Sequence, residues 1–289
     1  VANAGDNSVS VIPGNGDGTF GSQTTWTTQA GGGTNGDEPT DLAATDLNFD
    51  GTPDIVTANT FTDNGTILYN DPAAPGDFFT GDFAVFVGAG SGPLVNAIDD
   101  LGNDGDPDLV FGGQGGSIVT RFNEYSDSAP AFPTFPTSNS ISVGGRIVGI
   151  SVADFDDLET DGDSDLVVVD ELNDALTVLI NTGNAVYVNG GVFDTGDSPN
   201  QPAVGDIDGD GDDDVVVPHL NGDSIGVFRN ISTVVGGPEP IAEITSPMNF
   251  TEGGCVCPPD ATVTGTADIP AGGVFGSYTL EYRAVDDPG

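Results

Sequence analysis

Four short stretches of this chain place carboxylates on alternate residues and then run into a glycine and a hydrophobic strand. The most regular one extends from Asp206 to Asp214 and is followed by Val215, Val216 and Val217. So many acids in one loop repel one another and lose hydration unless a cation neutralises them. Oxygen donors on alternate residues suit a hard divalent ion, and calcium is the first candidate. The stretch therefore predicts a Ca²⁺-binding loop.

The other three stretches are variants of this pattern. They cover residues 46–54, 100–108 and 154–165. The second has Gly102 where the third loop position needs an oxygen. It predicts either weak binding, with water, Asp99 or Asp106 as substitute donors, or a structural turn without an ion. The third carries an insertion at 157–160, which we expect to bulge outward and leave the cage intact.

An acidic loop recurs about every fifty residues, which is the length of a four-stranded propeller blade. In each unit a short apolar strand enters the loop, a strand rich in Val, Ile and Leu leaves it, and a turn leads to another alternating strand. Residues 1–20 fit the second half of such a unit. With 44 Gly and 20 Pro and no sustained helical periodicity, the chain predicts an all-β fold of propeller blades, with four loops and one partial unit visible.

The charge balance restricts the partners. The chain has 46 Asp and Glu against 4 Lys and Arg, a formal net charge of -42, and no lysine. Nucleic acid and anionic membranes are therefore excluded as expected partners, and cations are favoured. No apolar run approaches the about 20 residues that a membrane helix needs. The chain begins at Val1, as if within a strand, and we interpret it as a fragment or a processed product.

These units resemble the FG-GAP/VCBS repeats, the blades of calcium-binding β-propellers in integrin alpha subunits and in secreted bacterial proteins. The resemblance rests on the acidic loops with hydrophobic strands behind them, on the Gly-Asn-Gly-Asp-Gly-Thr-Phe turn at 14–20, and on Phe-Val-Gly-Ala-Gly at 86–90. It covers about residues 1–235. It implies a Ca²⁺-stabilised propeller located outside the cell or on its surface.

The resemblance also implies the ligands, because each family loop uses side-chain oxygens from positions 1, 3, 5 and 9 and a main-chain carbonyl from position 7. Transferred to this chain, the candidates are Asp46, Asn48, Asp50, Thr52 and Asp54; Asp100, Asp104, Asp106 and Asp108; Asp154, Asp156, Asp161, Asp163 and Asp165; and Asp206, Asp208, Asp210, Asp212 and Asp214. An EF-hand fits less well, because Val217 occupies the position of its bidentate Glu and strands flank the loop. Acidic turns without an ion would leave the alternate spacing of the oxygens unexplained.

The acidic loops stop near the C-terminal end of the chain, and segments that alternate apolar and polar residues replace them. We predict a propeller over 1–235, a linker over 236–240, and part of an Ig-like or fibronectin-like β-sandwich over 241–289. Cys255 and Cys257 are candidates for a disulfide, with each other or with other partners. The sequons at Asn64, Asn230 and Asn249 are candidate glycosylation sites.

The preferred function is a non-enzymatic one. His219 has no accompanying nucleophile motif and is expected to be a loop histidine. We predict a secreted or cell-surface scaffold for adhesion or assembly, whose partners are Ca²⁺ and an extracellular protein or glycan ligand, or copies of itself. One alternative is a subunit of an extracellular filament or surface layer, completed by strand exchange. Another is a catalytic or non-catalytic part of a secreted carbohydrate-active enzyme.

Overall fold

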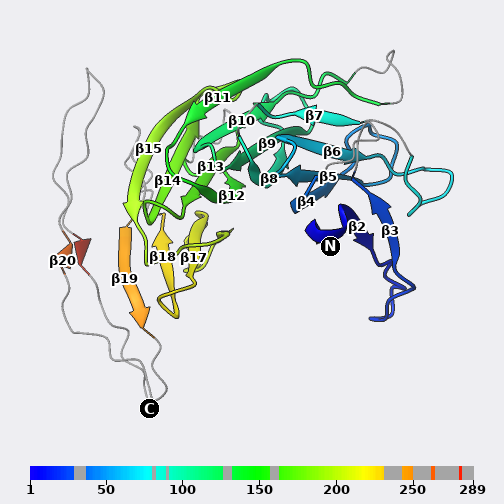
Figure 1. Ribbon diagram of the computed structural model, residues 1–289. Coiled ribbons are helices and arrows are strands. Elements are labelled where there is room, and N and C mark those ends of the chain that lie inside the picture. The colour runs from blue at the N-terminus through cyan, green and yellow to red at the C-terminus, as the bar shows by residue number, and fades with distance from the viewer. Residues whose placement is uncertain are drawn as a thin grey trace.

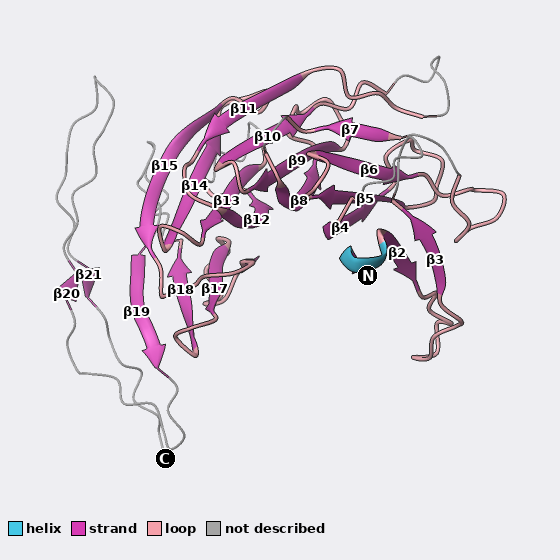
Figure 2. Ribbon diagram, in the orientation of Figure 1, coloured by secondary structure: helices cyan, strands magenta, loops and turns pink. Residues whose placement is uncertain are grey.

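The computed structural model describes residues 1–28, 37–79, 83–88, 91–125, 132–156 and 163–230, together with the strands at 243–249, 262–263 and 280–281. Every described element is a β-strand, apart from one turn of 3-10 helix, η1 (Ala4–Asp6). Figure 2 shows this composition at a glance. The all-β prediction is confirmed, and within the described part of the chain no helix is long and apolar enough to cross a membrane.

The strands form consecutive antiparallel sheets that follow the chain in order. The sheets are β1 (Ala2–Asn3), β2 (Ser8–Val11) and β3 (Thr24–Thr27); β4 (Pro39–Thr45), β5 (Asp54–Asn59), β6 (Asn64–Leu68) and β7 (Ala84–Phe86); β8 (Pro93–Asp99), β9 (Asp108–Gly113), β10 (Ser117–Arg121) and β11 (Ser138–Ser142); β12 (Ile147–Ala153), β13 (Asp165–Asp170), β14 (Ala175–Asn181) and β15 (Tyr187–Asp194); and β16 (Ala203–Gly205), β17 (Asp214–His219), β18 (Ser224–Arg229) and β19 (Glu243–Asn249). Each four-stranded sheet is one blade.

The blades stand side by side along an arc (Figure 1). The innermost strand of each blade lies next to that of the following blade, so that β4 neighbours β8, β8 neighbours β12, and β12 neighbours β16. This arrangement confirms the prediction of propeller blades. The first sheet has three strands and corresponds to the predicted partial unit at 1–20.

Hydrophobic cores lie between successive blades. The second strand of a blade is buried on both faces, as in β13, where Leu166, Val167, Val168 and Val169 are fully buried. Side chains from one face pack toward the preceding blade and those from the other face toward the following blade, which explains the continuous apolar runs after each acidic loop. Four such clusters join the five sheets in series.

The inner strands have two chemically different ends. Each of β4, β8 and β12 runs directly into an acidic loop at its C-terminal end. Leu47, Leu101 and Phe155, the second residue of each of these loops, are 0–1% exposed and belong to the cores between blades. The acidic loops are therefore anchored in the cores and are not free surface turns.

The structure describes only part of the C-terminal region for which a linker and a β-sandwich were predicted. Strand β19 pairs with β18, which places residues 243–249 in the sheet of the last blade. A separate pair is formed by β20 (Thr262–Val263) and β21 (Leu280–Glu281). The linker at 236–240, Cys255 and Cys257 lie outside the described residues, as does the side chain of Asn249, and the partial sandwich over 241–289 stays a prediction.

His219 is a buried strand residue, which corrects the expectation of a loop histidine. It ends β17, is 4% exposed, and accepts a hydrogen bond from Gly196 N at Nε2 (3.0 Å). Its Nδ1 lies 3.1 Å from Ser224 Oγ. Burial lowers the pKa of His219 from its ordinary value of 6.5, so the ring is neutral in the fold.

Because the folded pKa is lowered, the stability contributed by neutral His219 is present above the unfolded pKa and is lost as the pH falls through the folded pKa. We expect the melting temperature to fall more between pH 7.5 and 5 in the native chain than in His219→Gln. Thermal unfolding followed by circular dichroism at both pH values measures this difference. Equal pH dependence in the two proteins would show that His219 does not contribute.

Candidate metal centres

The acidic loops share a backbone that requires left-handed residues. The loop glycines Gly51, Gly105 and Gly211 have φ of 93°, 93° and 105°. A second left-handed residue precedes each glycine by two positions; these residues are Phe49, Asn103 and Gly209, with φ of 55°, 53° and 82°. The sequence predicted the glycines but not the second position, where Phe49 carries the strain of a positive φ.

The first carboxylate of each loop closes the turn. Asp46 accepts hydrogen bonds from the backbone N–H groups of Asp50 (3.1 Å) and Gly51 (2.8 Å). Asp100 accepts the equivalent bonds in the second loop, and Asp206 accepts one from Gly209 N in the fourth. The alternate carboxylates are thereby drawn to the inside of the loop.

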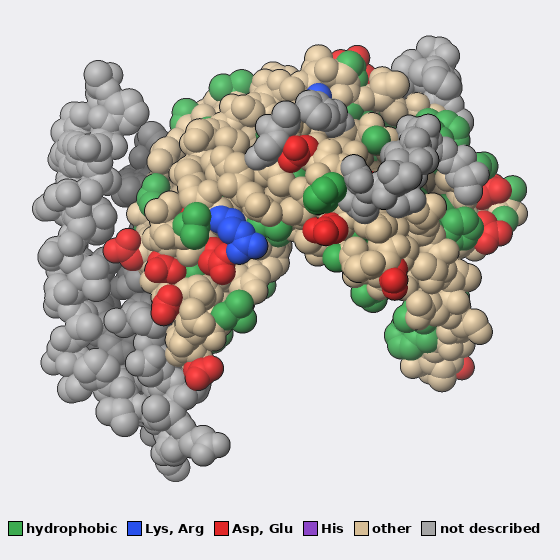
Figure 3. All heavy atoms as spheres, in the orientation of Figure 1, with side chains coloured by type: hydrophobic (Ala, Val, Ile, Leu, Met, Phe, Trp, Pro, Cys, Tyr) green, Lys and Arg blue, Asp and Glu red, His purple; other side chains and the backbone are tan. Residues whose placement is uncertain are grey.

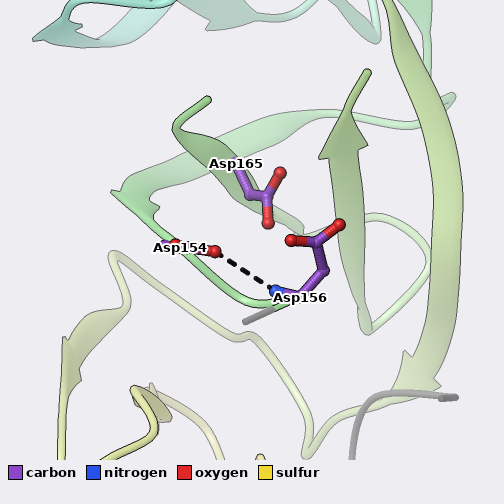
Figure 4. A group of neighbouring side chains, drawn as sticks. All are labelled: Asp154, Asp156 and Asp165. Atoms are coloured by element: carbon purple, nitrogen blue, oxygen red, sulfur yellow. Dashed lines mark hydrogen bonds between the residues drawn. The ribbon is translucent and has the colours of Figure 1, made fainter. Parts of the chain in front are cut away.

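Two of the four loops bring three carboxylates together. One oxygen from each of Asp154, Asp156 and Asp165 lies within 4.8 Å of the others, and the same holds for Asp206, Asp208 and Asp210. Figure 4 shows Asp156 and Asp165 facing each other, with Asp154 Oδ1 accepting a bond from the backbone N–H of Asp156. This all-oxygen donor set fits Ca²⁺. Asp161 lies outside the described residues, and Asp163 is not part of the group.

The first two loops are built differently. In the first, Asn48 supplies an amide at the third position and its Nδ2 donates to Asp50 Oδ2 (3.0 Å), while Thr52 Oγ1 donates to Asp50 Oδ1. In the second, Gly102 supplies no side chain, and of the suggested substitutes Asp99 accepts a bond from Ser164 Oγ of the next blade. Within the described residues neither loop gathers three carboxylates, so Ca²⁺ binding there stays a prediction.

The last carboxylate of each loop is buried. Asp54, Asp108, Asp165 and Asp214 begin the second strand of their blades and are almost fully buried. Burial raises the pKa of Asp54, Asp108 and Asp165 to about 7, and neighbouring carboxylates of the same loop add to the shift. A divalent cation beside these groups would favour their charged form, and would thereby offset both the cost of burying the charge and the repulsion between carboxylates.

These buried carboxylates also organise the backbone around them. One oxygen of Asp165 accepts from Phe155 N (2.9 Å) within the loop, and the other accepts from Asn181 N (2.7 Å) at the end of β14. The same pair of bonds recurs at Asp54, Asp108 and Asp214, with distances between 2.8 and 3.1 Å. Each loop is thus fixed to the third strand of its own blade.

An asparagine then connects the blade to the preceding loop. The side-chain amides of Asn123, Asn181 and Asn230 donate to the carbonyl groups of Leu47, Leu101 and Phe155, at 3.0, 3.0 and 3.1 Å. The bonds span 76, 80 and 75 residues and cross from one blade to the previous one. We call these three residues the latch asparagines. They couple each of the first three acidic loops to the next blade.

The sequence analysis missed the latch asparagines, although a signal exists. Asn70, Asn123, Asn181 and Asn230 follow the buried loop carboxylate by 16, 15, 16 and 16 residues. The sequon interpretation of Asn230 is corrected, because its amide nitrogen is buried and donates to Phe155. Asn64 lies in β6 and accepts from Asn59 Nδ2 (2.8 Å); its glycosylation stays a prediction.

Replacing a latch asparagine is expected to destabilise the chain. Asn181→Ala removes the side-chain donor of the Leu101 and Ser164 carbonyl groups, of which Leu101 keeps the bond from Ala185 N (3.0 Å), and we expect a loss of about 2 kcal/mol in the free energy of unfolding. Urea denaturation measures it. The matched control is Asn221→Ala, an exposed asparagine that donates only to Ser198 Oγ, and a loss of the same size in both variants would contradict the latch.

Comparison with known proteins supports the repeat and the architecture. Residues 157–217 match the model of the FG-GAP-like repeat. No curated protein sequence matches the chain at a significant level. The matched region runs from the third loop through β13, β14 and β15 to β17 and includes the fourth loop, so the repeat that the acidic spacing predicted is present in this part of the chain.

Solved structures share the fold at low sequence identity. A protein titled as a putative 6-phosphogluconolactonase from Bacteroides uniformis matches 83% of this chain with a TM-score of 0.58 and 16% identity. A protein from Lactobacillus plantarum matches 89% with 0.60 and 16%, and the periplasmic gluconolactonase of Pseudomonas aeruginosa matches 84% with 0.58 and 15%. The chain spans 64%, 69% and 63% of these three structures.

These matches overturn the expectation that the chain is not an enzyme. The fold of the blades is shared with structures titled as lactonases, and this architecture is compatible with catalysis. At 15–16% identity the likeness shows the fold alone. The class defined by fold and loops is therefore a β-propeller arc that contains an FG-GAP-like repeat.

Proposed function

We propose that this chain is a Ca²⁺-stabilised β-propeller scaffold of a secreted or cell-surface protein that binds an extracellular ligand. The observation that carries the proposal is the convergence of Asp154, Asp156 and Asp165, and of Asp206, Asp208 and Asp210, at equivalent loops of two successive blades. A bound ion would neutralise each group. The third loop is anchored in a core and latched to the next blade, so an ion there would stabilise a junction between blades, whereas an ion in the fourth loop would stabilise the last blade itself.

The location follows from the same chemistry. A formal charge of -42 keeps the chain soluble and attracts cations. Sites assembled from a few loop carboxylates fill where Ca²⁺ is plentiful, as it is outside the cell, where affinities of about 10⁻⁴–10⁻³ M suffice. We therefore place the protein in an extracellular or cell-surface compartment.

Calorimetric titration of the cation-free chain with CaCl₂ tests the scaffold proposal. We expect at least two ions to bind, and Asp208→Asn to remove one of them, because Asp208 belongs to the fourth-loop group. Asp197→Asn, which changes an exposed acid outside the loops, is the matched control and should leave the stoichiometry unchanged. Absence of binding at millimolar CaCl₂ would rule the proposal out.

A second candidate function is a part of a secreted carbohydrate-active enzyme. The fold match to structures titled as lactonases favours it. The test is a screen of the chain against glucono-lactone and a panel of glycans, following ring opening or release of reducing ends. Turnover that is seen with the purified protein and is absent from a reaction without it would support catalysis. Inactivity toward every compound of the panel would count against catalysis and favour the scaffold function.

Assembly with copies of the same chain is a further form of the scaffold proposal. Ile207 occupies the loop position at which Leu47, Leu101 and Phe155 are buried, yet it is 52% exposed. Among the described residues, no following blade covers this position of the last blade. Light scattering with and without Ca²⁺ tests self-assembly, and a monomer under both conditions would count against it.

A further inference from the structure

A polar hollow lies at the opposite end of the inner strands from the acidic loops. It has a volume of about 390 Å³ and is walled by residues of four blades, including Asp41 near the start of β4, Val95 of β8, Arg146 just before β12, Glu171 just after β13 and Gln201 before β16. Ligand pockets in proteins commonly have volumes of about 300–1,000 Å³. The hollow is thus large enough for a small molecule. The length of the inner strands separates it from the acidic loops.

The blades share the backbone at this rim but differ in its side chains. In four blades a residue after the second strand donates its N–H to the carbonyl group of a residue before the inner strand, and the pairs are Thr60 with Glu38, Gln114 with Gly92, Glu171 with Arg146, and Leu220 with Ser198. Because the other three blades make the same contact without them, the fold does not require the side chains of Arg146 and Glu171. Their presence in one blade calls for another explanation.

Arg146 and Glu171 form an ion pair at the edge of the hollow. Their side chains are 39% and 28% exposed, and a pair of this exposure contributes little to stability. Asp170 holds the backbone of Arg146 in place by accepting its N–H (2.9 Å). A guanidinium group carries five N–H donors, so pairing with one carboxylate leaves donors for a ligand.

The remaining walls are preorganised. Asp41 Oδ2 accepts from Asn96 N (3.0 Å), which fixes its carboxylate beside the hollow. The amide of Gln201 is tied to Ile150 at both ends, by a donated bond of 2.7 Å and an accepted bond of 3.3 Å. Val95 and Val148 supply apolar surface. Side chains held in this way lose little conformational freedom when a ligand binds.

The charge of the hollow selects among ligands. One guanidinium, of Arg146, and two carboxylates, of Asp41 and Glu171, line the hollow, so a further anion would be repelled, whereas a neutral molecule with several hydroxyl groups could donate to the carboxylates and accept from the guanidinium. Figure 3 shows how sparse basic atoms are on the drawn face of this chain, on which acidic side chains are more numerous. Recognition of hydroxyl groups by fixed charged groups above an apolar wall suits a sugar ring.

We propose that the hollow binds a neutral sugar residue, with Glu171 and Asp41 accepting from its hydroxyl groups and Arg146 donating to its oxygens. The inference deepens the second candidate function by placing the sugar, but it needs no hydrolysis and no Ca²⁺. The result of the sugar-binding experiment is therefore independent of the scaffold proposal, because either one can be wrong while the other is right.

The experiment is saturation-transfer NMR of the full chain in CaCl₂ with the methyl glycosides of glucose, galactose, mannose and N-acetylglucosamine, and with gluconate as the anionic counterpart. We expect at least one glycoside to bind with a Kd of about 10 mM or below and more tightly than gluconate. Arg146→Gln and Glu171→Gln should each weaken binding about 10-fold or more, the cost of losing one charged hydrogen bond.

Arg229→Gln is the matched control, because Arg229 also forms a partly exposed ion pair, with Asp208 (3.2 Å), but does not line the hollow. It should leave sugar binding unchanged. Circular dichroism checks that each variant is folded. If Arg146→Gln does not fold, Glu171→Gln alone tests the proposal. The proposal is overturned if no glycoside of the panel binds, if gluconate binds more tightly than every glycoside, or if the control weakens binding as much as the hollow variants.

Discussion

Removing divalent cations with excess EGTA is expected to lower the melting temperature of this chain by about 10–20 °C. In about 10 mM CaCl₂, two sites with a Kd of about 10⁻⁴ M are at 100 times their Kd, and each contributes about 2.7 kcal/mol to the free energy of unfolding. In a chain of this size each kcal/mol shifts the melting temperature by about 2–4 °C. Thermal unfolding followed by circular dichroism, with and without EGTA, measures the effect.

The reason for a large effect lies in where the loops are attached. Each loop is fixed to its own blade by a buried carboxylate, and in the first three loops the second residue packs in the core that is shared with the next blade. Unneutralised acids in the loop between β12 and β13 therefore strain a junction between blades as well as a surface turn. Ion loss from this loop should loosen that junction, and ion loss from the fourth loop should loosen the last blade.

Adding CaCl₂ back should restore the melting temperature, whereas Mg²⁺ should restore less, because Mg²⁺ requires a stricter octahedral geometry. Sodium chloride at matched ionic strength is the control for general screening of the acidic surface. A melting curve that excess EGTA leaves unchanged would contradict Ca²⁺ stabilisation.

The loops and the blades were predictable because their determinants are local. Alternate carboxylates before a glycine, as in residues 206–214, are read directly from the chain, and the period of the loops gives the blade. The runs of Val, Ile and Leu after each loop predict a strand buried on both faces, and β13 is such a strand. Periodicity and loop chemistry agree with each other throughout this region.

Features that depend on contacts between distant residues were not predictable. The bond from Asn181 to Leu101 spans 80 residues; the spacing of Asn181 from Asp165 marks the asparagine in the sequence but does not reveal its partner in the preceding blade. Asp41 and Arg146 line the same hollow although the blade of β8–β11 stands between their own blades, because the inner strands of successive blades lie next to one another. In isolation each is an ordinary charged residue, and the charge balance of the hollow exists only after the inner strands have been arranged.

The insertion in the third loop leaves the described carboxylates of that loop together, as the sequence analysis expected. The extra residues at 157–160 separate Asp156 from Asp165 along the chain. Asp165 nevertheless starts β13 and is held by Phe155 and Asn181, while Asp154 and Asp156 directly follow β12. The paired strands fix the two ends of the loop, so three of its carboxylates meet whatever the length between them.

Replacing the buried carboxylate of this loop should be the most damaging single change. Asp165→Ala leaves two buried N–H groups, of Phe155 and Asn181, without an acceptor, and each costs about 1–3 kcal/mol. Relief of repulsion from Asp154 and Asp156 offsets part of this cost. We expect a net loss of about 3 kcal/mol in the free energy of unfolding, measured by urea denaturation in EGTA.

Asp165→Asn separates the structural role of this side chain from its role toward the ion. An amide keeps one acceptor oxygen for the two N–H groups and carries no charge, so in EGTA it should be less destabilised than Asp165→Ala. In CaCl₂ it should gain less stability than the native chain, because one of the three converging carboxylates has been neutralised. Asp197→Ala, an exposed acid outside the loops, should change neither quantity. If Asp165→Ala were as stable as Asp197→Ala, the loops would not organise the blades, and the ion could not act through them.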